Sequence, residues 1–131
     1  MSHYVVYHNP DAMDYPASEI VGFSVVTDKA APPDLEGSTI WLLTGEGSPR
    51  RYYLVQRFTA DRIESGAVQG FRTRVAADTG DHFRPMIRID EEEWFRDFLR
   101  SQGNFAFGLQ RITDEQFIGG LEEVASHGTH Q

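Results

Sequence analysis

Alternating apolar and polar positions predict β-strands along the first two-thirds of the chain. Clusters of glycine, proline, asparagine and aspartate separate these runs and favour turns. The expected strands cover residues 4–7, 22–27, 39–43, 52–59, 71–77 and 84–89. The run TIWLL is apolar on both faces, which is typical of a strand that is buried on both sides or closed into a barrel.

After residue 89 the apolar residues recur with a helical period. Asp90 with Glu93 forms a capping-box pattern for a first helix, which Gly103 is expected to end. Its apolar stripe consists of Trp94, Phe95, Phe98 and Leu99.

A second capping-box pattern, Thr113 with Gln116, predicts a further helix. Gly119 and Gly120 weaken it by roughly 1 kcal/mol each. Between the two helices a short strand or extended segment is indicated by the alternation of Phe105, Phe107 and Leu109.

Strands followed by two C-terminal helices predict an α+β fold, with a mainly antiparallel sheet that forms a small mixed β-barrel. A length of 131 residues suits a single domain, 1–131. We expect a strand-rich barrel over about 3–89, a helical part over about 90–126 and a frayed tail at 127–131.

The formal net charge is -8, but it is unevenly distributed. Residues 50–88 carry eight arginines and four acids, whereas residues 1–49 carry one base and seven acids. Alternation places six arginines on the non-core faces of three strands: Arg51, Arg57, Arg72, Arg74, Arg84 and Arg88. They either form a basic face for a nucleic-acid backbone or pair with the chain's own acids.

Several function classes lose support from composition and motifs. The chain has no cysteine, no apolar run long enough to cross a membrane and no signal-peptide pattern, so we expect a cytoplasmic protein without a membrane partner. It contains no H-x-x-x-H, H-E-x-x-H or G-x-S-x-G motif. We therefore assign no catalytic residue, metal ligand or cofactor, and the sequence does not favour an enzyme.

The stretch TGEGSPRR, residues 44–51, lies between two apolar runs. A phosphate-binding P-loop needs Gly-Lys-Ser/Thr before a helix, and here a strand follows. Glycines favour the positive φ of tight turns, so this stretch is predicted to be a hairpin turn. Its amides and the guanidiniums of Arg50 and Arg51 could also bind an anion.

The order of several segments carries a family resemblance. A first strand ending in YHNP is followed by one ending in TDK, then by EGSTIWLLTGEGSPRRYYL, which has G-x-x-I-W before the glycine hairpin, and then by arginine-bearing strands. Over about residues 3–77 this layout resembles the PUA-like superfamily. The most similar branch is the EVE and EVE-like domains, with ASCH and YTH domains as relatives. The C-terminal helices match less well.

The resemblance implies a small mixed β-barrel whose mouth takes a single base, often a modified one, flipped from DNA or RNA. It implies that Asn9 and Thr27 meet the base edge and that Trp41 or Phe23 stacks on the ring. The implied phosphate-binding residues are Lys29, Arg50 and Arg51.

Three function classes remain open. The first is a non-catalytic nucleic-acid or modified-base binding module with a pocket at the barrel mouth. The others are an acidic protein-interaction or accessory domain and a small-ligand, nucleotide-like sensing domain. A net charge of -8 is unusual for a free-standing nucleic-acid binder, so the sequence predicts weak binding, a small ligand or help from a partner.

Overall fold

The computed structural model describes residues 2–68, 70–105 and 108–128. In chain order the elements are β1 (His3–His8), α1 (Pro10–Met13), η1 (Ala17–Glu19), β2 (Phe23–Thr27), β3 (Thr39–Glu46), β4 (Arg51–Thr59), β5 (Arg62–Val68), β6 (Phe71–Ala77), β7 (Asp81–Arg88), α2 (Phe95–Ser101), η2 (Gly103–Phe105), β8 (Gln110–Ile112) and α3 (Glu115–Ser126), where η marks a short 3-10 helix. None of the helices within these ranges has both the length and the apolar character needed to span a membrane.

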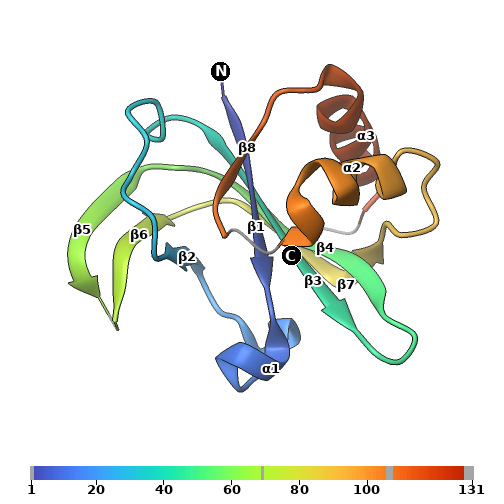
Figure 1. The fold of residues 1–131 in the computed structure, drawn as a ribbon, viewed down its shortest axis with the longest axis horizontal. Helices are drawn as coiled ribbons and strands as arrows, with labels where there is room; N and C mark the ends of the chain where they lie inside the picture. Colours follow the sequence, from blue (N-terminus) through green and yellow to red (C-terminus); the bar gives the residue numbers. More distant parts are fainter. Residues whose placement is uncertain (1, 69, 106–107, 129–131) are drawn as a thin grey trace.

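The strands form two sheets (Figure 1). The larger sheet has the order β7-β4-β3-β1-β8, and the smaller has the order β2-β6-β5. Only β1 and β3 run parallel among the described pairs; the other pairs are antiparallel. The fold is therefore α+β and mostly antiparallel, as the sequence predicted. Among the described strands these pairings do not join into one closed ring.

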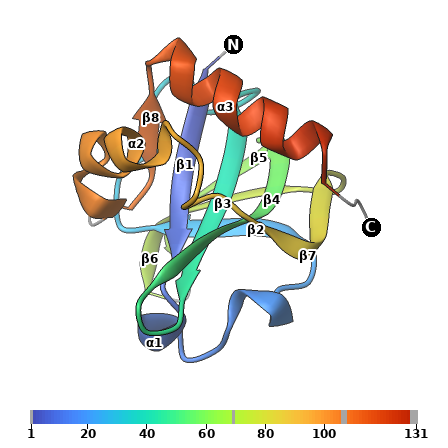
Figure 2. The ribbon, with the colours of Figure 1, turned by 90° about the vertical axis from the view of Figure 1, so that its right-hand side faces the viewer.

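Both faces of the five-stranded sheet are covered. The smaller sheet packs on one face, where Ile40, Leu42 and Val75 belong to one apolar core. Helices α2 and α3 cover the other face, where Trp41 and Leu43 belong to a second core (Figures 1 and 2). Because β3 contributes to both cores, its apolar run TIWLL is buried on both sides, as the sequence indicated.

The alternation predicted for β4 is interrupted. It places Val55 on the same face as Arg57, which we expected to be non-core, but Val55 is only 4% exposed and belongs to the core between the sheets. Leu54 belongs to the helix-side core, whereas Phe58 belongs to the core between the sheets, although the two share parity. The pairing of β4 with β7 shifts register between Leu54 and Gln56, and an irregularity of this kind turns the following residues to the other face of the strand.

Both helix starts differ from the expected capping boxes. Asp90 lies five residues before α2, and its carboxylate accepts a hydrogen bond from the backbone N–H of Tyr52 at 3.0 Å and pairs with Arg88. Helix α2 begins at Phe95, and no side chain caps its N-terminus. In α3 the cap is Asp114 rather than Thr113, and its carboxylate accepts from the Gln116 N–H at 2.8 Å.

Two further segments differ from the prediction. Strand β5 was not expected, because its sequence RIESGAV has few apolar residues and lies at the edge of the smaller sheet. The expected extended segment at 105–109 is replaced by η2, which ends at Phe105, and by β8, which begins at Gln110; Phe107 lies outside the described residues. Strand β8 pairs with β1, so the helical part of the chain also contributes to the large sheet.

Candidate ligand-binding cavity

A cavity of about 930 Å³ lies between the two sheets. It is lined by the second half of β1, most of β2, the segment from Asn9 to Val21, and residues near Gly108. Its size falls within the range of roughly 300–1,000 Å³ found for small-molecule sites. The one described partner of β2 is β6, so the other edge of β2 borders this cavity with backbone donors and acceptors.

Asn9 lines the cavity at the start of α1. Its side-chain Oδ1 accepts hydrogen bonds from the backbone N–H groups of Asp11 at 3.0 Å and Ala12 at 3.3 Å. This capping role fixes which end of the amide is the oxygen and leaves the NH₂ group as a donor. Asn9 is therefore suited to recognise an acceptor on a ligand.

Thr27 and Lys29 line the opposite wall at the end of β2. Thr27 is 5% exposed, and its Oγ1 accepts from the backbone N–H of Lys29 at 3.2 Å, so its hydroxyl proton can still be donated. The Lys29 ammonium donates to the carbonyl of Leu109 at 3.1 Å. Gly108 lies against this wall, since a Cβ there would be 3.2 Å from Thr27 Oγ1.

Arg50 reaches the cavity from the β3–β4 hairpin and is held by Tyr7. Its Nη1 donates to the Tyr7 hydroxyl at 2.9 Å. Burial raises the pKa of Tyr7, although the nearby Arg50 charge opposes the shift, so the hydroxyl stays protonated at neutral pH. Gly45 makes room for this pair: a Cβ there would overlap the Tyr7 hydroxyl and lie 2.8 Å from Arg50 Cδ.

Aromatic residues that the sequence did not assign to a site complete the cavity: Tyr15, Phe71 and Phe105. The Phe105 ring stacks on Tyr7 at a centroid distance of 5.5 Å and an interplanar angle of 13°. Asn104 and Phe105 have φ angles of 58° and 62°, which are unusual for residues other than glycine. The sequence signal was partial, because Gly103-Asn104 suggests a left-handed turn but nothing predicts it for a phenylalanine.

The structure does not bring the other three predicted residues to this cavity. The Phe23 ring packs instead against Phe58 at 5.8 Å and His82 at 4.6 Å. Arg51 is exposed at the start of β4 and is not among the lining residues. Trp41 is completely buried on the helix side of the sheet, and its Nε1 donates to Nδ1 of His3 at 3.1 Å.

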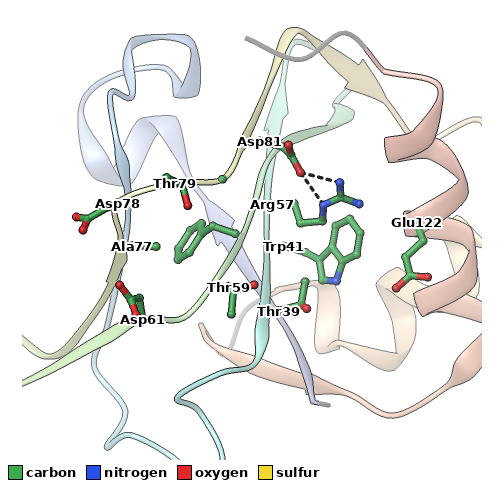
Figure 3. A pocket seen from close by; sticks show the side chains of 12 residues that line it. Thr39, Trp41, Arg57, Thr59, Asp61, Ala77, Asp78, Thr79, Asp81 and Glu122 are labelled. Carbon is green, nitrogen blue, oxygen red and sulfur yellow. Dashed lines mark hydrogen bonds and ion pairs between the residues drawn. The ribbon is translucent and has the colours of Figure 1, made fainter.

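Trp41 borders a second cavity, of about 510 Å³ (Figure 3). The Arg57 guanidinium lies 5.5 Å from the Trp41 ring centroid and pairs with Asp81 at 2.6 Å. Figure 3 shows this guanidinium between the indole and Asp81, with Glu122 facing the indole from α3. Because Arg57 already covers the ring, a flat ligand would have to displace it before stacking on Trp41.

The six alternating arginines do not form one face. Strand β6, which carries Arg72 and Arg74, belongs to the smaller sheet, whereas β4 and β7 are neighbours in the larger one. Three of the six arginines also pair with acids of the chain: Arg57 with Asp81, Arg74 with Glu64 and Arg88 with Asp90. Of the two alternatives left open by the sequence, the continuous basic face is therefore wrong, and pairing with the chain's own acids accounts for half of the set.

Within the described ranges, no group of three or more histidine, aspartate or glutamate side chains is arranged to hold a metal ion. Comparison of the chain with protein-family models, with curated proteins and with solved structures gave no significant match. The function is therefore argued from the cavity between the sheets.

Proposed function

We propose that the chain is a non-catalytic binding module that holds a single base-like ring in the cavity between its sheets. One observation carries this proposal: four residues selected from the sequence for base or phosphate binding, Asn9, Thr27, Lys29 and Arg50, line the same cavity. They come from three separate segments, with Thr27 and Lys29 close together at the end of β2, so the convergence of these segments is not a consequence of spacing in the sequence.

The chemistry of the walls supports a flat, polar-edged ligand. Tyr15, which is 37% exposed, and the half-buried Phe71 supply aromatic surface, and aromatic side chains stack readily on the faces of bases. The Asn9 amide and the Thr27 hydroxyl can donate to ring nitrogens or carbonyl oxygens at a base edge. Arg50 and Lys29 supply positive charge for an anionic group.

We further propose that the two sheets are a PUA-like barrel. The order of the strands along the chain and the cavity between the sheets support this assignment, although β2 pairs with β6 and with no strand of the large sheet among the described residues. In this proposal the base enters the cavity between strands β1 and β2, which both line it.

The test measures binding to normal and methylated nucleosides and nucleotides by calorimetry, and to short single- and double-stranded DNA and RNA by fluorescence polarisation. We expect saturable binding of at least one ligand. The key variant is Asn9→Ser, because serine also caps a helix but lacks the amide donor. It should weaken binding at least about tenfold, the value of one hydrogen bond of about 1.4 kcal/mol, while the unfolding curve stays close to that of the parent.

Two results would contradict the proposal. The first is the absence of binding to every ligand at about 100 μM, where even non-specific nucleic-acid binding is normally detected. The second is binding that Asn9→Ser leaves unchanged, which would place the ligand outside this cavity.

A further inference from the structure

The cavity is not a positively charged groove. Its basic lining residues within the described chain are Lys29 and Arg50, and its acidic ones are Glu19 and Asp28. The lining is therefore close to neutral at pH 7. A groove that binds a polynucleotide backbone instead presents a row of bases to successive phosphates.

Pairing within the chain removes half of the eight arginines of residues 50–88 that could supply that row. Four arginines of the basic middle segment are paired with acids: Arg57 with Asp81 at 2.6 Å, Arg62 with Asp78 at 2.7 Å, Arg74 with Glu64 at 2.7 Å and Arg88 with Asp90 at 3.0 Å. A phosphate that approached one of these arginines would meet a neighbouring carboxylate as well. With a net charge of -8, the molecule as a whole repels a polyanion.

We infer that the ligand of this cavity is a free nucleotide with a single phosphate, rather than a base flipped from a nucleic-acid strand. This inference rests on the proposed function, because it assumes that a base-like ring enters the cavity. One phosphate matches the single guanidinium of Arg50, and Lys29 is the other basic residue of the lining. Tyr7 holds one guanidinium nitrogen of Arg50, which leaves the other donors for two phosphate oxygens.

The experiment compares three forms of each base at several salt concentrations: the nucleoside, its 5′-monophosphate, and a nine-nucleotide single strand with the same base at the centre. We expect the monophosphate to bind at least tenfold more tightly than the nucleoside and at least as tightly as the strand. For the monophosphate and for the strand, log K should depend only weakly on log salt, because each phosphate contact to a single strand contributes a slope of only about -0.7.

Arg50→Gln identifies the phosphate contact. It should weaken binding of the monophosphate at least about tenfold more than binding of the nucleoside, since hydrogen bonds to charged groups are the strong ones. Arg96→Gln is the matched control, because Arg96 is exposed on α2 and does not line the cavity. It should change neither affinity.

The outcomes separate this inference from the function on which it rests. If the strand binds tenfold or more tightly than the monophosphate, with a salt slope steeper than about -3, the free-nucleotide inference is overturned and base binding stands. Equal effects of Arg50→Gln on nucleoside and monophosphate would also overturn it. If none of the three forms binds, the proposed function fails, and the inference fails with it.

Discussion

Gly119 and Gly120 are neighbours in α3, but their surroundings differ. A Cβ added to Gly119 would meet no atom within 4 Å. A Cβ added to Gly120 would lie 2.5 Å from Nε1 and 2.9 Å from Cδ2 of the Trp94 indole. From the sequence, both glycines were expected only to weaken the helix. In the structure, Gly120 leaves the space into which the Trp94 indole packs.

The two alanine variants should therefore change stability in opposite directions. Gly119→Ala should stabilise the fold by about 1 kcal/mol, the difference in helix propensity between the two residues. Gly120→Ala gains the same amount but must displace an indole that also packs on Phe98 at 5.8 Å. Overpacking of this kind costs about 1–3 kcal/mol, so the net effect should lie between no change and a loss of about 2 kcal/mol.

Urea unfolding followed by tryptophan fluorescence measures both variants. At 131 residues, 1 kcal/mol corresponds to roughly 3–5 °C in Tm, so thermal unfolding gives an independent value. The m-values should match the parent, because neither change alters the surface exposed on unfolding. If both variants stabilise the protein equally, Trp94 does not pack on Gly120 and the account of the α2–α3 contact is wrong.

Three further predictions follow from single groups. Gly45→Ala should weaken nucleotide binding in calorimetry, since its Cβ displaces Tyr7 and Arg50; unchanged affinity would show that this pair does not position the ligand. Burial lowers the pKa of His3 below 6.5, so the unfolded chain binds more protons and stability should fall as the pH drops below 6.5. His3→Gln should flatten that decline in urea titrations, and an identical decline would contradict the assignment. Burial and a hydrogen bond to Asp34 raise the pKa of Tyr4 to about 12, so stability should be lost as the pH rises from 10 towards 12. Tyr4→Phe should reduce this loss, and an unchanged loss would contradict the assignment.

Much of the fold could be predicted because local patterns and tertiary structure agree. The apolar run at 39–43 predicted a strand covered on both faces, and the helical stripes predicted α2 and α3. Strand β5 escaped prediction because an exposed edge strand needs little apolar sequence. The helix starts were misplaced because Asp90 serves the neighbouring strand through Tyr52 and Arg88, a long-range role that no local pattern encodes.

The candidate site was predictable in part for similar reasons. Asn9, which follows β1, and Thr27, which ends β2, were candidates through the PUA-like resemblance, and both line the cavity. Trp41 was a candidate because tryptophan stacks well on bases, but parity along β3 directs it towards the helices. The alternation along β3 does not tell which face of the large sheet borders the cavity, because that depends on how the smaller sheet and the helices pack on it.

The central position of β1 has a consequence for how the protein folds. This strand lies between β3 and β8, and its register pairs His3 with Thr39 on one side and with Ile112 on the other. Contacts between residues so far apart in sequence slow folding, because the chain loses the entropy of closing a long loop before the contact can stabilise the folded state. During synthesis one edge of β1 stays open until Ile112 has been added, even when the β1–β3 pair has formed. A chain that stalls before β8 would expose that edge, so it should be the form of this protein most prone to aggregate or to require a chaperone.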